Sequence, residues 1–180
     1  MVYVLLGTGF EGMEALTPVD LLRRADIQVQ TVGLNGKVVY GSHKIGVQAD
    51  ILPEEMDLDA MEMIVVPGGL GGVKSIRESA RAMDAIRFAW EHDKYVAAIC
   101  AGPTVLADLG ITDGRKATCY PGCVGGMGNA DVQQNMAFVA DGKLITGTSA
   151  GCAVKFALAL VATVGGFEAA RKVSDQIVIR

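Results

Sequence analysis

The sequence has few of the residues that mark secreted, nucleic-acid-binding or membrane proteins. It contains only four cysteines in 180 residues, which is too sparse for the disulfide framework of a small secreted domain. Acidic residues (20) outnumber basic ones (16), and no block of Lys and Arg occurs. We therefore expect a protein with free thiols and no nucleic-acid partner.

Long apolar runs are also missing. The longest uncharged apolar stretch covers residues 156–167, which is 12 residues, whereas a membrane-spanning helix needs about 18. The chain starts as MVYVLLGTGF, without the basic segment that precedes the apolar part of a secretory signal. The sequence thus predicts no membrane partner and a cytoplasmic location.

Small apolar residues and glycine are abundant. Hydrophobic residues make up 51% of the chain, aromatic residues only 6%, and there are 23 glycines. This is enough apolar material for a core, and the length fits one domain over residues 1–180. Continuous apolar runs at 2–6, 63–66 and 95–99 end at or near Gly or Pro, which is typical of strands buried on both faces of a parallel sheet.

Helical patterns alternate with these strands. Apolar residues recur at helical spacing over 13–25 and over 79–91, where Ser79 is placed to cap the helix. Residues 152–164 are apolar nearly all round, so this helix should be central. The alternation predicts an α/β sandwich with a mostly parallel sheet, helices on both faces, and a small β-hairpin insertion at 37–49.

Three predicted strands end in segments that carry reactive or glycine-rich sequences. These are GTGFEGMEA (7–15), PGGLGG (67–72) and CAGP (100–103). In α/β sheets the functional crevice lies at the carboxyl ends of the strands, so the three segments should converge there.

Cys100 is the candidate nucleophile at this edge. It lies between a strand and a helix that starts around Pro103, a turn that presents a side chain at the top of the sheet. We expect the start of the helix to favour the thiolate. The alternative from position alone is a buried structural thiol.

Glu14 is the second candidate, because it lies near the start of the first helix, after a glycine-rich loop. If the loops are adjacent, its carboxyl could hydrogen-bond the Cys100 sulfur and move a proton, for which it should have a raised pKa. The alternatives are the neighbouring Glu11, and an acidic residue that only favours the start of a helix.

Gly68 and Gly69 leave their backbone amides open to a developing oxyanion. The PGGLGG segment lacks the Gly-Lys-Ser/Thr ending of a phosphate-binding loop. The GTGFEG segment has no suitable acidic residue downstream for a dinucleotide site. We therefore expect no metal and no other cofactor.

Neither histidine forms an obvious dyad with Cys100. His92 precedes strand 95–99 and Cys100 follows it, which separates them by roughly 16 Å at about 3.3 Å per strand residue. No histidine follows Cys100, which argues against a Cys-His-Glu amidotransferase or a papain-type protease. His43, in the hairpin, is either a solvated residue or a possible member of the pocket.

The other three cysteines are interpreted as bystanders. Cys119 and Cys123 are too few for a zinc site, and a redox pair is the less favoured alternative. Cys152 starts the most apolar helix and is expected in the core.

Several segments together resemble the ThiJ/PfpI superfamily, and within it the parkinsonism-associated protein deglycase branch. They are EGMEALTPVDLLRRADIQVQTVGL, VVPGGLGG, AAICAGPTVLADLGI and FALALVATVGG, which span nearly the whole chain. The alanine that follows Cys100 separates the chain from the protease-like branch, in which this position is His.

The resemblance implies a flavodoxin-like domain, usually a homodimer, that needs no cofactor. By this resemblance Cys100 is the nucleophile and Glu14 the protonated carboxyl. The amides of Gly68, Gly69 and Ala101 stabilise the oxyanion.

The chain also departs from the family pattern at three positions. Tyr120 stands where relatives often have His, His43 where they have Arg, and Thr148 where they have a further basic residue. The resemblance therefore implies a pocket with less positive charge, with Tyr120 and His43 as possible members.

Three functions fit these residues. The first is an enzyme acting on small α-oxoaldehydes such as methylglyoxal, by glyoxalase-type conversion to a hydroxy acid or by deglycation of glyoxal adducts. The second is an oxidative-stress redox sensor or chaperone that uses the same Cys100 and Glu14. The third is a binding domain with a vestigial site, in which the Cys100 thiol would have an ordinary pKa.

Overall fold

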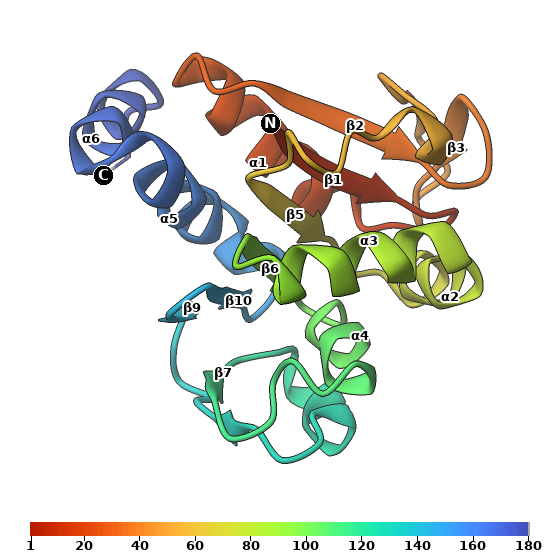
Figure 1. Cartoon of the computed structure of the whole chain (residues 1–180). Helices are drawn as coiled ribbons and strands as arrows, with labels where there is room; N and C mark the ends of the chain where they lie inside the picture. Colours follow the sequence, from red (N-terminus) through yellow and green to blue (C-terminus); the bar gives the residue numbers. More distant parts are fainter. Residues whose placement is uncertain (180) are drawn as a thin grey trace.

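Six strands form the central sheet of this computed structural model, which describes residues 1–179 (Figure 1). The sheet order is β2-β1-β5-β6-β10-β9, and β9 alone runs antiparallel to its neighbour. The strands are β1 (Val2–Leu6), β2 (Val29–Gly33), β5 (Met63–Val66), β6 (Tyr95–Ile99), β9 (Phe138–Asp141) and β10 (Leu144–Gly147).

The continuous apolar runs are strands covered on both faces. Along β1, Val2 and Val4 pack into the core on one side of the sheet, while Tyr3 and Leu5 pack into the core on the other. All four side chains are buried. Because successive side chains point to opposite faces, only a sheet with helices on both sides explains this pattern.

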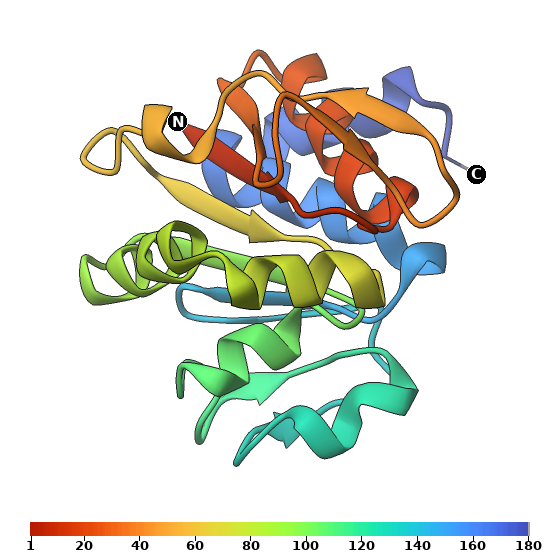
Figure 2. The same cartoon turned by 90° about the vertical axis from the view of Figure 1, so that its right-hand side faces the viewer.

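Two helix layers supply this cover. The helices α1 (Gly12–Arg24), α5 (Ala153–Gly165) and α6 (Phe167–Gln176) lie on one face, and α2 (Leu70–Glu78), α3 (Ala80–Glu91) and α4 (Pro103–Asp108) on the other. Figures 1 and 2 show α5 and α6 (blue) separated from α2 and α3 (yellow-green) by the strands. The predicted α/β sandwich is confirmed.

The helix boundaries follow the sequence signals closely. Helix α3 begins at Ala80, and the Ser79 side chain accepts a hydrogen bond from the Ala82 amide at 3.3 Å, as a capping serine should. Helix α5 lies between α1 and α6. It is not enclosed on all sides, however, because Val154 is 38% exposed.

The predicted hairpin insertion consists of β3 (Val38–Tyr40) and β4 (Gly46–Gln48), which pair antiparallel. Two hydrogen bonds fix it to the loop between β1 and α1. The Gly9 amide donates to the Tyr40 carbonyl and the Ser42 amide to the Phe10 carbonyl, both at 2.8 Å. The hairpin therefore lies beside one of the three expected site segments.

The remaining elements are short. The strands β7 (Lys116–Ala117) and β8 (Asp131–Val132) form a two-stranded parallel pair. Three 3₁₀ helices cover Pro53–Glu55, Pro121–Gly126 and Ala150–Cys152. Within residues 1–179, no helix is long and apolar enough to cross a membrane.

Candidate active site

The carboxyl ends of β1, β5 and β6 meet at one edge of the sheet, because these strands are neighbours and parallel. Each strand runs through a short glycine-containing segment into a helix: α1, α2 and α4 respectively. The expected convergence of residues 7–15, 67–72 and 100–103 is therefore what the fold produces.

Cys100 occupies a strained turn between β6 and α4. Its φ is 65°, a left-handed conformation that side chains other than glycine seldom adopt. Its amide donates to the Gly147 carbonyl at 3.0 Å, which ties the turn to the neighbouring strand. A Cβ at Gly102 would lie 2.4 Å from the Val66 carbonyl oxygen, so glycine is required for this tight turn. The backbone thus holds the thiol at the top of the sheet.

Glu14 lies directly behind this thiol. It is the third residue of α1 and its side chain is buried, with 1% of the residue exposed. Its Oε2 accepts a hydrogen bond from the Gly68 amide at 3.0 Å, and the Cys100 side chain and the Ala150 amide lie close enough to lower its pKa. The carboxyl of Glu14 therefore lies beside three other segments of the chain.

Gly68 is the point where these groups meet. A Cβ on Gly68 would lie 2.4 Å from Glu14 Oε2 and 2.8 Å from Cys100 Cβ, so no other residue fits without displacing one of them. The Gly68 amide is occupied by Glu14. This corrects the prediction that this amide faces an oxyanion, since it orients the acid instead. Gly69 and Ala101 do line the cavity in front of Cys100.

Burial sets the protonation of Glu14 and Cys100. It raises the pKa of Glu14 to about 7, and the hydrogen bonds from Cys100, Gly68 and Ala150 only partly oppose it. Burial and the neighbouring Glu14 carboxylate raise the pKa of Cys100 to about 12, while the Ala101 amide acts in the opposite direction.

The stabilisation of the thiolate by the helix start stays a prediction. Helix α4 has only six residues, and desolvation and the Glu14 charge act against the thiolate by raising the pKa of Cys100. Near pH 7 the Glu14 carboxyl can therefore lose its proton while the Cys100 thiol keeps its own.

A cavity of about 310 Å³ opens in front of Cys100. Leu70 and Tyr120 stand at its rim, 83% and 49% exposed. None of its lining residues carries a positive charge. The lining residues are Gly69, Leu70, Cys100, Ala101, Tyr120, Gly122 and Cys123.

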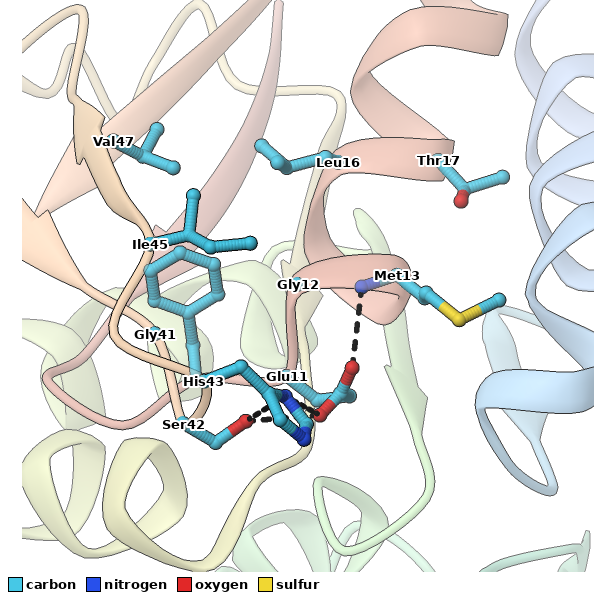
Figure 3. Close-up of a pocket in the computed structure, with 11 residues that line it drawn as sticks. Glu11, Gly12, Met13, Leu16, Thr17, Gly41, Ser42, His43, Ile45 and Val47 are labelled. Carbon is cyan, nitrogen blue, oxygen red and sulfur yellow. Dashed lines mark hydrogen bonds and ion pairs between the residues drawn. The ribbon is translucent and has the colours of Figure 1, made fainter.

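His43 lies outside this cavity, in a separate apolar groove of about 410 Å³ between α1 and the hairpin (Figure 3). Its Nδ1 is 3.1 Å from Ser42 Oγ and 3.6 Å from Glu11 Oε2, and its side chain is 77% exposed. Glu11 caps α1, accepting a hydrogen bond from the Met13 amide. In this chain His43 is thus bound to Glu11 and Ser42 rather than placed beside Cys100.

His92 lies at the end of α3, just before β6, where its Nδ1 is 2.9 Å from the Phe88 carbonyl oxygen. Since Cys100 follows β6, the strand separates the two residues, as the sequence indicated.

The sequence did not predict four residues of the site, which are Leu70, Gly122, Cys123 and Ala150. Cys123 had been interpreted as a bystander, but it lines the cavity. Cys152 is half-buried rather than part of the core, with its sulfur 3.9 Å from Ser149 Oγ. Ala150 follows β10, the strand next to β6, and this position is the feature that indicates a place near the site.

Comparison with known proteins agrees with this architecture. The sequence profile of the DJ-1/PfpI family matches residues 1–163. This chain belongs to the DJ-1/PfpI family. It is 35% identical over 178 residues to Protein dj-1beta of Drosophila melanogaster, covering 98% of this chain and 95% of that protein.

Two further comparisons concern a solved structure and a relative that is named as an enzyme. The crystal structure of Drosophila melanogaster DJ-1beta superimposes with a TM-score of 0.95 at 34% identity, covering 99% of this chain and 97% of that one. Deglycase PfpI of Pyrococcus furiosus is 32% identical over 124 residues, which are 69% of this chain and 74% of that protein. The flavodoxin-like fold implied by the resemblance is confirmed.

The buried Glu14 predicts a pH-dependent stability. Its pKa is about 7 in the folded chain, against an ordinary value of 4.5. The folded state therefore favours the neutral acid, and this stabilisation is fully present below pH 4.5 and lost as the pH rises through 7. The total change from this group is about 3 kcal/mol.

We expect Glu14→Gln, which stays neutral, to be more stable than wild type above pH 7 and similar to it near pH 4.5. Urea denaturation across this range measures the difference. Glu54→Gln, at an exposed position, is the control and should follow wild type. Parallel pH profiles for Glu14→Gln and wild type would contradict the shifted pKa.

Proposed function

We propose that this protein is a cofactor-independent cysteine enzyme that acts on α-oxoaldehydes such as methylglyoxal, or on their adducts with proteins. The observation that carries the proposal is the buried Glu14 carboxyl, with a pKa of about 7, bonded to a thiol that faces an open cavity. Relatives named as deglycases in Pyrococcus abyssi and Pyrococcus furiosus support it.

In the first step Cys100 attacks the aldehyde carbon. The thiol has a high pKa, so its proton must leave as the carbon–sulfur bond forms. The Glu14 carboxylate, already hydrogen-bonded to that side chain, accepts this proton. The aldehyde oxygen gains the electron pair of the carbonyl bond, and the amides of Gly69 and Ala101 stabilise its charge until Glu14 passes the proton to it and is a carboxylate again.

In the second step Glu14 moves a proton between the two carbons. As the carboxylate it removes the proton from the former aldehyde carbon of the hemithioacetal, which gives an enediolate with its charge on the former ketone oxygen. The hydroxyl proton of the first carbon moves to that oxygen. As the acid it then returns a proton to the adjacent carbon. The product is a hydroxyacyl thioester of Cys100. A pKa of about 7 suits both directions of transfer near neutral pH.

Water completes the turnover by hydrolysing the thioester. This releases lactate and restores the Cys100 thiol, so the net reaction adds one water to methylglyoxal. For an adduct, the carbon attacked carries a hydroxyl group and the amine of the modified protein. Cys100 attacks this carbon, the carbon–nitrogen bond breaks, and the amine leaves with a proton, which gives the same hemithioacetal. The uncharged lining of the cavity fits a small neutral carbonyl compound.

We expect Cys100→Ala to abolish lactate formation from methylglyoxal in metal-free protein, because the covalent intermediate cannot form. Glu14→Gln should lower kcat by about 10²- to 10⁴-fold, the usual contribution of a positioned acid–base group. Enzymatic lactate determination measures both. Cys152→Ala removes a thiol outside the cavity and should retain the wild-type rate, whereas a Cys100→Ala protein that still forms lactate would refute the mechanism.

The pH dependence of kcat/KM follows from Glu14 and Cys100. The productive form has lost one proton, so kcat/KM should rise with pH through about 7 and then level off. The position of the last proton, on oxygen or on sulfur, does not alter this expectation. Glu14→Gln should lose the rise near pH 7. A wild-type rate that falls as the pH rises through 7 would contradict the assignment of Glu14 as base.

We also propose that the chain forms a homodimer, as the family resemblance implies. The groove beside His43 is surrounded by exposed apolar side chains, since Met13, Leu16 and Ile45 are 57%, 36% and 65% exposed. Burial of such a patch favours association. Sedimentation velocity at micromolar concentration should show a dimer for wild type and a monomer for Leu16→Glu. A monomeric wild type would refute the proposal.

A further inference from the structure

The cavity contains two thiols, Cys100 and Cys123. Both are half-buried free cysteines that line the same space. The aldehyde mechanism uses only Cys100. A second thiol within the same cavity therefore has no role in the proposed turnover.

Two hydrogen bonds link the backbones that carry the thiols. The Tyr120 amide donates to the Cys100 carbonyl at 2.9 Å, and the Cys123 amide donates to the Tyr120 carbonyl at 2.7 Å. Cys123 is thus one 3₁₀ turn away from a residue bonded directly to Cys100. This route keeps the two cysteines close although 22 residues lie between them in sequence.

The segment that carries Cys123 lies at the surface. The 3₁₀ helix Pro121–Gly126 has no buried residue and contains three glycines. Disulfide formation demands a narrow range of Cα separation and side-chain orientation. A surface segment rich in glycine can reach this geometry at small cost, whereas Cys100 is held rigidly by its turn.

A positive charge lies near Cys123. Burial and the Glu14 charge raise the pKa of this thiol, and the guanidinium of Arg77 partly opposes them. Arg77 is itself held in place by Asp108 at 2.6 Å and by Thr104 Oγ1 at 2.9 Å. A fixed positive charge therefore stands beside the second thiol.

We propose that Cys123 is the resolving thiol of Cys100, forming a reversible disulfide across the cavity when a hydroperoxide oxidises Cys100. In the first step the Cys100 sulfur attacks the peroxide, the O–O bond breaks, and sulfenic acid and an alcohol form; hydrogen peroxide gives water. In the second step the Cys123 sulfur attacks the sulfenic sulfur, the S–O bond breaks, and water leaves. The two thiols together lose two electrons and two protons, and the peroxide gains them.

Cys119 is the competing partner, because it lies four residues before Cys123. Its side chain is buried, with 1% of the residue exposed, and its sulfur donates to the Tyr120 carbonyl at 3.4 Å. It does not line the cavity. The disulfide with Cys100 is therefore the one that the cavity favours, and it would protect Cys100 from irreversible sulfinic acid.

Peptide mapping after mild treatment with hydrogen peroxide tests the proposal. Trypsin cleaves after Lys94, Arg115, Lys116 and Lys143, so Cys100 lies on peptide 95–115, and Cys119 and Cys123 lie together on 117–143. Under non-reducing conditions we expect these two peptides to be linked, in wild type and equally in Cys119→Ser. Dithiothreitol should separate them.

A linkage inside peptide 117–143, or sulfinic acid at Cys100 without any linked peptide, would overturn the proposal. So would loss of the link in Cys119→Ser. This readout is independent of aldehyde turnover, so the disulfide and the proposed enzyme activity can fail separately.

Variants at Cys123 provide the second test. Cys123→Ser and Cys123→Ala should accumulate sulfinic acid at Cys100, and dithiothreitol should restore none of the thiol. In wild type and in Cys152→Ser, dithiothreitol should restore most of it. Each protein is compared with its own untreated sample, so a change in basal activity does not matter. Full restoration in both Cys123 variants would refute the role of Cys123.

Discussion

The candidate site depends on a buried carboxyl group placed beside a thiol. Glu14 is kept from water by the sheet edge and is oriented by the Gly68 amide at 3.0 Å. Removing this carboxyl from water makes its ionised form costly, so it titrates near neutral pH and can both accept and return a proton. In the proposed mechanism, the reactivity of Cys100 depends on this neighbouring carboxyl group.

The fold makes this contact possible by joining distant segments. Glu14 comes from α1, Gly68 from the end of β5, Cys100 from the end of β6 and Ala150 from the segment after β10. Only a parallel sheet brings the carboxyl ends of these strands to one edge. The left-handed turn at Cys100 and the space that glycine leaves at position 68 then fix the distances.

The sequence predicted the features of the fold that depend on residues close together in the chain. The apolar runs, the Ser79 cap and the strand–Cys–helix turn each depend on residues close in the chain, and each is present in the structure. The pKa of Cys100 and the place of Cys123 in the cavity depend on segments far apart in sequence. Desolvation and proximity of this kind cannot be read from spacing, so the sequence indicated neither the raised pKa of Cys100 nor the position of Cys123 in the cavity.

Direct titration of the Glu14 side chain tests the central claim. The carbonyl resonance of its carboxyl can be followed by NMR in protein labelled with ¹³C at glutamate, and it is assigned by its loss in Glu14→Gln. The burial of this carboxyl predicts a midpoint at about pH 7 for Glu14 in wild type. A midpoint near 4.5, the ordinary value for glutamate, would contradict it.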